Sequence, residues 1–480
     1  MSHLSKIYRC SFGLMTDLYQ LTMAYGYWKN NLHDRPAVFN LYYRKNPFGG
    51  SYAIACGLEL AVDFLQNFKF SANDVQYLGS LQGADGKALF SESFLNYLQR
   101  MSFSCSIDAI PEGTIVFPHE PLIRVEGPLL QAQLIETILL NIINFSSLIA
   151  TKASRIVRAA EHDSVLEFGF RRAQGIDGSL TATRATYIGG CHATSNVLAG
   201  QLFDIPVKGT HAHSWVMCFD DELESFSAYA AALPNNCIFL VDTYDTIEGV
   251  RNAIKVGKKL RQDGHEMQGI RLDSGDLAEL SITARSLLDE AGFKDTTIVA
   301  SSDLDEFKIK KLKERGAKIS VWGVGTRLAT AYDQPALGGV YKLAAIQDKN
   351  GNWEHRLKLS EQAIKVSNPG ILQVKRYVDH KGTPVGDLLY DTLIPTPTSN
   401  LIRFGSHESV QLNSHNSQNL LVPIFQNGKL VYNLPSIHKI RDHCLNQLGL
   451  FNLDLIGSYP CGLEKKLFDR KQSIINDLNN

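Results

Sequence analysis

The stretch Val207-Lys-Gly-Thr-His-Ala-His-Ser-Trp-Val216 decides the fold prediction. Its first residues predict a short strand, and polar side chains crowd the end of that strand. Residues two apart in a strand project to the same face, so His211 and His213 are expected on one side, beside the hydroxyls of Thr210 and Ser214. Two imidazoles among hydroxyls favour a chemical site. The alternative is a pair of hydrogen-bonded structural histidines.

Around this stretch the sequence repeats a strand followed by an amphipathic helix. Strand-like segments occur at residues 164–169, 206–209, 237–242, 268–273, 296–301 and 318–323. Asp242 follows His213 by 29 residues, and Arg271 and Ser302 come after further intervals of 29 and 31 residues. Each interval is the length of one strand–helix unit, so a parallel sheet is expected.

Six such units predict an α/β fold whose central domain is an irregular α/β barrel. Residues 339–345 are a candidate seventh strand. A doubly wound open sheet has the same order of strands and helices and is the alternative. In either architecture the functional residues are expected at the C-terminal ends of the strands.

The 480-residue chain is too long for a single hydrophobic core, so two or three domains are expected. Residues 1–131 predict a mixed α/β domain, with a helix at 16–29 and a strand at 37–43. Residues 132–346 are expected to form the barrel domain. Residues 347–480 lose the strand–helix repeat and predict a region that packs on the N-terminal domain.

The composition is that of an ordinary soluble globular protein, with 44% hydrophobic and 20% charged residues. The net charge of −1 lacks the basic excess of nucleic-acid binders, so no nucleic-acid partner is expected. Eight cysteines without metal-binding spacing predict free thiols in a reducing compartment. No signal-peptide pattern opens the chain, and Glu136, Asn141 and Asn144 interrupt the longest apolar stretch, so no membrane span is expected. A cytoplasmic protein is predicted.

Several strand ends carry groups that favour anions. Gly323-Val-Gly325-Thr326 offers backbone N–H groups and a hydroxyl, and Ser301-Ser302 and Ser274-Gly-Asp276 each precede a predicted helix. These segments predict phosphate sites. The sequence has no Gly-x-x-x-x-Gly-Lys-Ser/Thr pattern, which argues against a P-loop nucleotidase.

Charged side chains at the same strand ends extend this prediction. Arg171, Arg172 and Arg271, together with the phosphate sites, indicate a substrate with two phosphate groups. Asp242 and Asp273 supply hard oxygen ligands that can hold a Mg²⁺ bridging a pyrophosphate.

A metal-dependent amidohydrolase is the alternative from another enzyme class, because barrel amidohydrolases open with His-x-His on the first strand. Such enzymes need further histidines at later strand ends, where this sequence has Asp, Arg, Ser and Gly. Stoichiometric zinc in the purified protein would favour this alternative.

A series of longer motifs runs from residue 15 to about residue 345. They are Thr16-Asp-Leu-Tyr-Gln-Leu-Thr-Met23, Glu167-Phe-Gly-Phe-Arg-Arg-Ala173, Thr194-Ser-Asn-Val-Leu-Ala-Gly200, Gly209-Thr-His-Ala-His-Ser214, Arg271-Leu-Asp-Ser-Gly-Asp276, Gly323-Val-Gly-Thr326 and Leu337-Gly-Gly-Val-Tyr-Lys-Leu343. These motifs resemble those of the nicotinate phosphoribosyltransferase family, and they occur in the same order as in that family. The final third resembles that family only in length and general pattern.

The resemblance implies a type II phosphoribosyltransferase, with an irregular α/β barrel and a second domain built from both ends of the chain. It implies a homodimer that joins nicotinate to 5-phosphoribosyl 1-diphosphate, giving nicotinate mononucleotide and diphosphate for NAD synthesis. It also implies coupling to ATP hydrolysis, with ATP as co-substrate and Mg²⁺ as cofactor.

The resemblance also implies residue roles. The family's phosphorylated histidine matches His213, and its ring-stacking tyrosine, donated across the dimer, matches Tyr19. Phe168 is similar to the opposing aromatic. The other implied positions are substrate contacts at Thr210 and Arg271, a contact to the 5-phosphoribosyl 1-diphosphate at Thr326, and phosphate or magnesium positions at Arg171, Asp242, Asp273 and Ser302; Gly325 is expected among the substrate-binding residues. His213, Arg271 and Asp273 are the expected catalytic residues.

One position departs from the family pattern. His192 stands where relatives often carry an acidic residue. If the His192 ring reaches the substrate, the sequence does not determine whether the site accepts nicotinamide. The alternative is that His192 is a structural histidine in a helix-start turn. Nicotinamide phosphoribosyltransferase, which shares fold and chemistry, is therefore the nearest alternative. A catalytically silent binding protein is a third.

Overall fold

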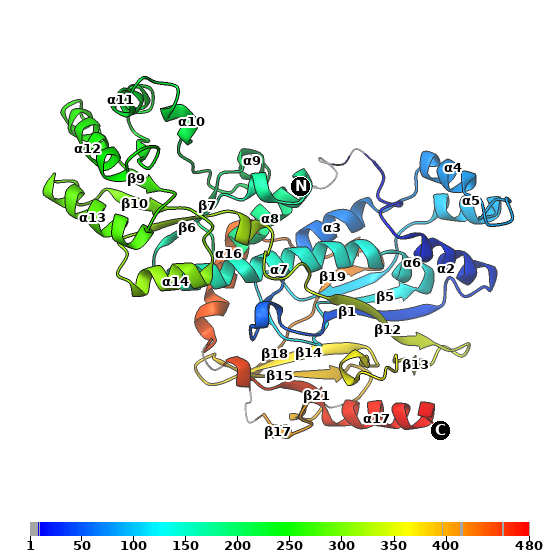
Figure 1. The fold of residues 1–480 in the computed structure, drawn as a ribbon. Helices are drawn as coiled ribbons and strands as arrows, with labels where there is room; N and C mark the ends of the chain where they lie inside the picture. Colours follow the sequence, from blue (N-terminus) through cyan, green and yellow to red (C-terminus); the bar gives the residue numbers. More distant parts are fainter. Residues whose placement is uncertain (1–7, 9, 396, 413–415, 454–455, 480) are drawn as a thin grey trace. The chain divides into compact units, whose positions relative to one another are not determined.

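The computed structural model describes residue 8 and residues 10–395, 397–412, 416–453 and 456–479. The chain forms two compact units (Figure 1). Unit 1 comprises residues 1–148 and 336–480, and unit 2 comprises residues 149–335.

Unit 2 alternates strands with helices. Its strands are β6 (Ser164–Glu167), β7 (Ala193–Thr194), β8 (Ile238–Leu240), β9 (Gly269–Leu272), β10 (Thr297–Ala300) and β11 (Val321–Val324). Its helices are α8 (Ile176–Ile188), α9 (Val197–Phe203), α10 (His213–Val216), α11 (Glu222–Ala232), α12 (Thr246–Gln262), α13 (Leu277–Glu290), α14 (Glu306–Glu314) and α15 (Thr326–Ala329), with a 3₁₀ turn, η2 (Phe170–Arg172). Helix α7 (Glu136–Ala160) enters unit 2 from unit 1.

The strands of unit 2 form one parallel sheet in the order β7-β6-β11-β10-β9-β8. A parallel bridge from Thr194 to Val207 extends the β7 edge. No described ladder joins β8 back to this edge, so the barrel-like sheet is irregular. The predicted α/β class with a parallel, barrel-like domain is confirmed.

Apolar helix faces cover the sheet of unit 2. Helices α12, α13 and α14 lie outside β9 and β10 (Figure 1) and contribute fully or nearly fully buried side chains such as Val250, Leu288 and Ile309. Each such side chain contributes roughly 1.5–3 kcal/mol by leaving water. Trp322 of β11 is fully buried, and its Nε1 donates to Asp163 Oδ2 at 3.1 Å.

These three helices begin at capped positions. Asp245, Asp276 and Asp305 each accept a hydrogen bond from a backbone N–H of the first helical turn. Such caps typically stabilise a helix by about 1 kcal/mol. They fix where each helix starts after its strand, and therefore where the strand-end loop lies.

Unit 1 is built mainly from antiparallel strands. They are β1 (Pro36–Tyr43), β2 (Ala53–Ile54), β3 (Ser106–Ala109), β4 (Ile115–Val116), β5 (Ile123–Pro128), β12 (Gly339–Gln347), β13 (Trp353–His355), β14 (Leu372–Val378), β15 (Pro384–Asp391), β16 (Asn400–Arg403), β17 (Ser409–Gln411), β18 (Asn416–Asn419), β19 (Val422–Gln426), β20 (Lys429–Leu430) and β21 (Cys461–Glu464). Its helices are α2 (Leu18–Lys29), α3 (Leu58–Asn67), α4 (Ala72–Ser80), α5 (Glu92–Arg100), α6 (Leu129–Leu134), α16 (Ile437–Leu450) and α17 (Lys465–Asn479).

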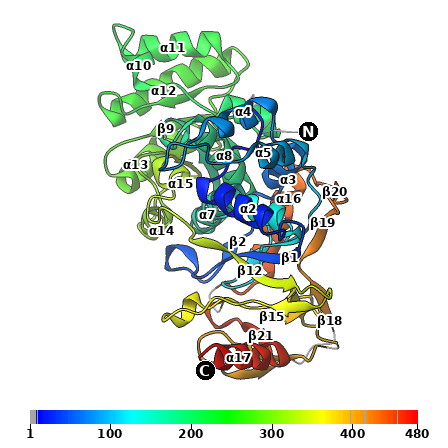
Figure 2. The same cartoon turned by 90° about the vertical axis from the view of Figure 1, so that its right-hand side faces the viewer.

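The described strands of unit 1 form two larger sheets and the β2-β4 pair. One sheet has the order β13-β12-β1-β5-β3-β19-β20, and the other β17-β16-β21-β15-β14-β18. Helix α17 packs on β16 and β21 through the buried Leu467 (Figure 2). Strands β19 and β20 come from the last third of the chain and join strands of the N-terminal third. The strand predicted at 37–43 and the helix predicted at 16–29 are present as β1 and α2.

The prediction of a seventh barrel strand at 339–345 is wrong. This segment is β12, which pairs antiparallel with β1 in unit 1 and stacks Tyr341 on Phe39 with ring centroids 4.9 Å apart. The chain divides at 148/149 and 335/336, whereas the expected boundaries were 131/132 and 346/347. The first boundary lies later than expected because α7 is one continuous helix that runs from unit 1 into unit 2. The second lies earlier because β12 pairs with β1 of unit 1.

No helix in the described part of the chain is both long and apolar enough to cross a membrane. The eight cysteines all lie among the described residues, and none of them forms a disulfide, as the sequence predicted.

Candidate active site

The carboxyl ends of the parallel strands bring charged and hydroxyl side chains, one aromatic ring and two glycines to one edge of the sheet in unit 2. They are Phe168 and Gly169 after β6, Asp242 and Thr243 after β8, Asp273 and Ser274 after β9, Ser301 and Ser302 after β10, and Gly325 and Thr326 after β11. Segments far apart in the sequence therefore supply one site, as the spacing predicted.

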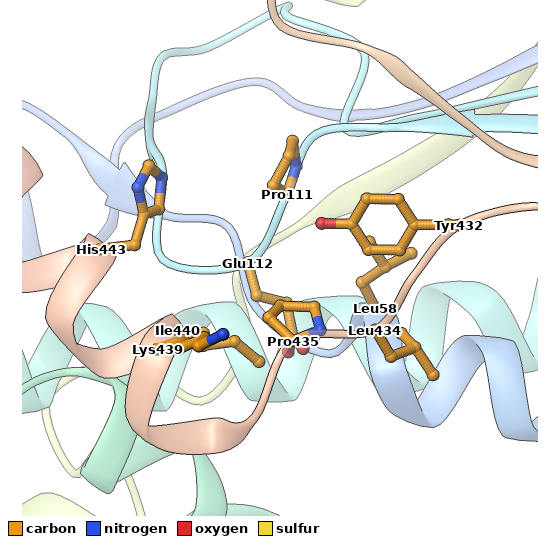
Figure 3. Close-up of a pocket in the computed structure, with 9 residues that line it drawn as sticks. All are labelled: Leu58, Pro111, Glu112, Tyr432, Leu434, Pro435, Lys439, Ile440 and His443. Carbon is orange, nitrogen blue, oxygen red and sulfur yellow. The ribbon is translucent and has the colours of Figure 1, made fainter.

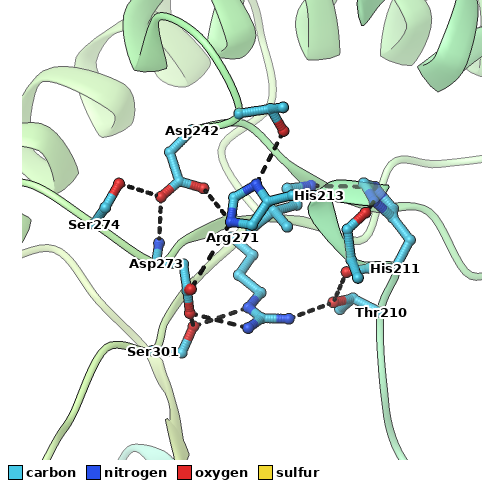
Figure 4. A network of polar contacts seen from close by, with 11 residues as sticks. Thr210, His211, His213, Asp242, Arg271, Asp273, Ser274 and Ser301 are labelled. Carbon is cyan, nitrogen blue, oxygen red and sulfur yellow. Dashed lines mark hydrogen bonds and ion pairs between the residues drawn. The ribbon is translucent and has the colours of Figure 1, made fainter. Parts of the chain in front are cut away.

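His213 is the first residue of α10 and lies between a hydroxyl and two carboxylates (Figure 4). Its Nδ1 is 3.1 Å from Thr243 Oγ1. Its Nε2 is 4.0 Å from Asp242 Oδ1 and 3.9 Å from Asp273 Oδ2. The side chain is 39% exposed, so a dissolved substrate can reach the ring. The contact with Thr243 orients the imidazole, and the two carboxylates lie just beyond hydrogen-bond distance of Nε2.

His211 is a structural histidine. Its Nε2 accepts a hydrogen bond from the Leu240 N–H at 3.2 Å, and its ring packs near Tyr229 with centroids 4.9 Å apart. Burial lowers its pKa, which keeps the ring neutral. The expectation that both histidines share a strand face is wrong, because the chain leaves the sheet after Val207 and the two-residue alternation ends there.

Asp242 ties the ends of β8 and β9 together. Its Oδ2 accepts hydrogen bonds from the Asp273 N–H at 3.0 Å and from the Ser274 hydroxyl at 2.5 Å. Its side chain is 1% exposed, and Oδ1 has no hydrogen-bond partner among the described residues. A buried carboxylate oxygen without a partner is costly unless a cation or a donor satisfies it.

Arg271 is held by three side chains (Figure 4). Its Nε donates to Ser301 Oγ at 2.9 Å, one terminal nitrogen to Thr210 Oγ1 at 3.1 Å, and the other to Asp273 Oδ1 at 3.0 Å. Ser301 in turn donates to Asp273 Oδ1. A guanidinium has five N–H groups, so one on each terminal nitrogen remains for a ligand.

Phe168 lies beside this guanidinium. The Cζ atom of Arg271 is 5.7 Å from its ring centroid, within cation–π range. The Phe168 N–H donates to Val324 O at 2.8 Å, which anchors the residue to β11. A Cβ atom at Gly323 would lie 2.7 Å from two ring carbons of Phe168, so only glycine leaves room for this ring position.

Glu167 supports the loop that carries Phe168. Its buried carboxylate accepts hydrogen bonds from the Gly169 N–H, from Thr183 Oγ1 at 3.0 Å and from Thr194 Oγ1 at 2.6 Å. Burial raises its pKa, although these hydrogen bonds act in the opposite direction. The carboxylate thus joins β6, β7 and α8 behind the site.

The predicted phosphate segments differ in their local structure. Gly325 precedes α15 and Thr326 is its first residue, so backbone N–H groups of that turn lack helical partners. Ser302 adopts a φ of 103°, and Lys308 Nζ donates to its carbonyl at 2.6 Å. Asp305, not Ser302, caps the following helix. Strained φ values of this kind are typical of functional loops.

Two predicted site residues stand apart from this network. Arg171 lies exposed in η2, with no contact to the residues around Arg271 among those the structure describes. Tyr19 lies on α2 in unit 1 and is 47% exposed. Burial is the largest of the causes that raise its pKa.

His192 lies beside the beginning of β6, away from the carboxyl ends of the strands. Its Nδ1 accepts a hydrogen bond from the Val165 N–H at 3.2 Å, and its backbone N–H donates to Val165 O at 2.8 Å. The strand pairing of Leu166 with Ala193 places it there. The structure therefore supports the interpretation of His192 as a turn residue.

Thr243, Ser274 and Ser301 complete the site. Ser274 and Ser301 lie in segments that were predicted to bind phosphate, whereas their contacts with Asp242 and Arg271 were not predicted, and no role was predicted for Thr243. Each directly follows or lies next to a predicted strand-end charge. Their position at a strand end was a usable signal. Serine and threonine are so common in loops that position alone does not select these three.

The described residues contain no cluster of three or more His, Cys, Asp or Glu side chains suited to a metal. Mg²⁺ needs fewer protein ligands, because phosphate oxygens and waters complete its shell. Asp242 Oδ1 has no hydrogen-bond partner among the described residues, and Asp242 Oδ1 and Asp273 Oδ2 lie 4.0 Å and 3.9 Å from the same atom, His213 Nε2. These two carboxylates fit a phosphate-bound Mg²⁺.

Comparison with known proteins covers nearly the whole chain. A model described as the nicotinate phosphoribosyltransferase (NAPRTase) family matches residues 164–356, and its N-terminal and C-terminal domain models match residues 14–144 and 372–456. The family pattern therefore extends into the final third, where the motifs had indicated only a general resemblance.

The chain is 43% identical to nicotinate phosphoribosyltransferase of Bacillus subtilis (strain 168), over 98% of this chain and 96% of that protein. It is 35% identical to the Homo sapiens nicotinate phosphoribosyltransferase, over 97% and 96% of the two chains. The crystal structure of human nicotinic acid phosphoribosyltransferase superimposes with a TM-score of 0.83 at 32% identity, covering 95% of this chain and 99% of that one. The chain belongs to the nicotinate phosphoribosyltransferase family.

Proposed function

We propose that this chain transfers the 5-phosphoribosyl group of 5-phosphoribosyl 1-diphosphate to nicotinate, giving nicotinate mononucleotide and diphosphate for NAD synthesis. Family membership supports this reaction. The observation that carries the proposal is the Arg271 guanidinium, held by three side chains with its Cζ 5.7 Å from the Phe168 ring centroid.

Arg271 and Phe168 together suit nicotinate, which is a flat ring with a carboxylate. The two N–H groups that remain on the terminal nitrogens of Arg271 can bind a carboxylate, and charge-assisted bonds of this kind are among the stronger polar contacts. The Phe168 ring offers an aromatic face. Nicotinamide has no charge to pair with Arg271, so the geometry favours the acid.

The reaction forms a bond between the pyridine nitrogen and the ribose C1 and breaks the bond from C1 to the diphosphate. Positive charge develops on the ribose and negative charge on the leaving group. In this proposal the Asp273 carboxylate, 3.9 Å from His213 Nε2, stabilises the ribose, and the N–H groups at Gly325 and Thr326 bind the leaving group. Mg²⁺ held by Asp242 and Asp273 would neutralise diphosphate charge.

ATP coupling through a phosphohistidine is part of the proposal. In this step an imidazole nitrogen of His213 takes the γ-phosphoryl group of ATP and ADP leaves, and water later releases orthophosphate. The exposed position of His213 next to Asp242 and Asp273 supports this role. A phosphoryl group there would change the charge of the site and so couple ATP hydrolysis to nucleotide formation.

A homodimer in which Tyr19 reaches the partner's site is also proposed. Tyr19 is about half exposed on α2, so its ring is available to a second chain. In this arrangement Tyr19 and Phe168 supply aromatic faces for the same nicotinate ring, one from each chain.

A competition assay tests the function. Nicotinate and nicotinamide are offered together with 5-phosphoribosyl 1-diphosphate, Mg²⁺ and ATP, and both mononucleotides are measured. The wild type is expected to prefer nicotinate by about 100-fold or more, the discrimination that a charged pair supplies. Arg271→Lys is expected to lower kcat/KM for nicotinate by about tenfold or more, because lysine cannot bind bidentately.

The control is Arg251→Lys, an exposed arginine on α12 that pairs with Glu248. It should behave as the wild type. Equal use of nicotinamide would favour a nicotinamide phosphoribosyltransferase. Tight binding of 5-phosphoribosyl 1-diphosphate with no mononucleotide would favour a silent binding protein. Family membership leaves the amidohydrolase alternative without support.

A further inference from the structure

Unit 1 contains a cavity of about 560 Å³, called here the Arg44 pocket. It is lined by residues from five segments: the residue after β1, the turn before β5, residues 364–368, the end of β16 with the turn that follows it, and β21 with helix α17. Among them are Arg44, His119, Phe404, Phe468 and Lys471. Small-molecule sites in proteins typically measure roughly 300–1,000 Å³. The pocket is therefore large enough for a drug-sized ligand.

The charge in this pocket is unbalanced. Three cationic side chains line it, Arg44, Arg403 and Lys471, and no lining residue is an aspartate or a glutamate. Arg403 lies 3.5 Å from Glu408, outside the lining. Neither of the other two has a carboxylate partner among the described residues.

Arg44 and Lys471 are also partly withdrawn from water. The Nε of Arg44 is buried without a hydrogen-bond partner among the described residues. Lys471 Nζ donates to the neutral Asn368 Oδ1 at 2.8 Å, and burial lowers the pKa of Lys471 to about 8. Buried cations are costly unless an anion pairs with them. Two such cations in one cavity indicate an anionic ligand.

Much of the remaining wall is apolar or neutral. The ring of His119 packs on Phe404 with centroids 4.8 Å apart, and burial, with the charges of Lys471 and Arg44, lowers its pKa to about 4. His119 is therefore neutral near pH 7, and Phe468 extends the aromatic wall. His119 holds a φ of 71°, a conformation that non-glycine residues rarely adopt outside constrained sites.

A second hollow of unit 1, of about 200 Å³ beside α16, provides a contrast (Figure 3). Its acidic residue, Glu112, already accepts hydrogen bonds from the Gly57 N–H at 2.6 Å and the Glu59 N–H at 3.3 Å. This carboxylate caps α3, so its charge needs no ligand. In the Arg44 pocket, by contrast, no carboxylate among the residues that the structure describes pairs with Arg44 or Lys471.

We propose that the Arg44 pocket binds a nucleoside monophosphate, with its phosphate at Arg44 and Lys471 and its base against Phe404 and Phe468. A phosphate monoester carries about −1.5 to −2 charge near pH 7, which matches two unpaired cations, whereas a carboxylate balances only one. The aromatic wall suits a flat base. None of these residues belongs to the strand-end site of unit 2, so the pocket is an additional site.

Equilibrium dialysis of the full chain with radiolabelled adenosine 5′-monophosphate tests the proposal. The variant Arg44→Gln/Lys471→Gln is expected to bind the nucleotide at least about tenfold more weakly than the wild type, because both charge-assisted contacts are lost. Its mononucleotide-forming activity should stay unchanged. Any binding at the strand-end site is common to both proteins, so their difference reports the pocket alone.

The matched control is Lys87→Gln/Lys381→Gln, which removes two charges from exposed positions of unit 1 outside the pocket. It should bind as the wild type does, and Arg44→Lys should retain most of the affinity. Equal affinity of the double pocket variant and the wild type, or adenosine bound as tightly as its monophosphate, would overturn the proposal. If the double variant does not fold, Lys471→Gln alone provides the same comparison.

A second arm identifies the source of the nucleotide. Unlabelled nicotinate mononucleotide is added to the dialysis, and this arm alone rests on the proposed function. Displacement of the label from the pocket indicates that the reaction product occupies it. Retention of the label indicates a purine nucleotide. Both results support a nucleoside monophosphate site.

Discussion

At the scale of single residues, the site depends on side chains that constrain one another. Asp273 contacts Arg271 and Ser301 through Oδ1 and faces His213 through Oδ2. One carboxylate therefore connects the proposed nicotinate position with the proposed phosphohistidine. In the proposed ATP coupling, a phosphoryl group on His213 would act electrostatically on Asp273, whose Oδ2 lies 3.9 Å from His213 Nε2, and through it on Arg271.

The histidine assignment is tested by labelling. Incubation with γ-³²P-labelled ATP is expected to place acid-labile phosphate on the wild type, and His213→Asn should abolish it, because no other described histidine lies between these two carboxylates. The control His162→Asn changes an exposed histidine and should label normally. Persistent label on His213→Asn would refute the phosphohistidine at this position.

The sequence predicts correctly that certain strand-end residues lie close together. Asp242, Arg271 and Asp273 converge because equal spacing along parallel strands brings their ends together. The prediction that His211 and His213 share one face is wrong, because the two-residue alternation of side chains applies only within a strand and the chain leaves the sheet after Val207. The charge balance of the Arg44 pocket was also beyond the sequence, since its residues come from five segments that are distant in the sequence.

At the scale of elements, the contact between β6 and β11 positions the aromatic face of the site. Gly323→Ala is expected to push the Phe168 ring aside, because the new Cβ would lie 2.7 Å from two ring carbons. Overpacking of this kind typically costs about 1–3 kcal/mol. The KM for nicotinate should rise about tenfold, as measured by steady-state kinetics, for a loss of about 1.4 kcal/mol in binding.

Gly178→Ala is the matched control for this substitution. Gly178 lies in α8, and a Cβ added there would meet no atom within 4 Å beyond its own helix backbone and chain neighbours. It should leave the KM for nicotinate unchanged and hold or raise the melting temperature. An unchanged KM in Gly323→Ala would show that the ring of Phe168 is not part of the nicotinate site.

A buried lysine links three elements of unit 2. Lys152 of α7 is fully buried and pairs with Asp333 after α15 and with Glu306 of α14, whose carboxylate is 2.7 Å away. The hydrogen bond from Lys152 holds the pKa of Asp333 below its ordinary value. The stabilisation from this contact is therefore fully present above about pH 4 and is lost as pH falls through the lowered pKa.

Asp333→Asn is expected to destabilise the protein at pH 7 by about 1–2 kcal/mol, since the second carboxylate remains and Asp333 is partly exposed. The difference from the wild type should shrink below about pH 4, where the carboxyl of the unfolded chain takes up its proton, and should vanish only below the lowered pKa of the folded carboxyl. Calorimetric melting at pH 7, 4 and 3 measures this. Asp295→Asn, an exposed control, should show little difference at any pH. A constant difference down to pH 3 would contradict the pairing.

The elements also show where periodicity is informative. The strand–helix repeat predicted β6 and β8 to β11, because buried parallel strands are short apolar runs followed by amphipathic helices. It misassigned β12, which has the same composition but finds its partner in β1. Composition sets the propensity for a strand, whereas its partner depends on pairing across the whole chain.

At the scale of the whole molecule, the proposed dimer shares residues between chains. Tyr19→Ala and Arg271→Gln chains, given different tags and co-expressed, yield heterodimers that tandem affinity steps isolate. If Tyr19 serves the partner's site, one site of each heterodimer is intact and the other carries both changes. The heterodimer should then have about half the wild-type activity, whereas each mutant homodimer is nearly inactive.

The heterodimer assay has a clear opposite outcome. If Tyr19 serves the site of its own chain, both sites of the heterodimer are defective, and its activity should match the mutant homodimers. A monomeric wild type in sedimentation analysis would likewise exclude the shared site. Wild-type chains carrying the same two tags provide the reference activity.

The pairing of β1 with β12 has a consequence during synthesis on the ribosome. One edge of β1 pairs with β5 early, but the strand that covers its other edge emerges only about 300 residues later. At roughly 5–20 residues per second, the nascent chain must shield that edge for about 15–60 s. Unit 2 is complete before then, so the interior of the chain can fold before its two ends meet.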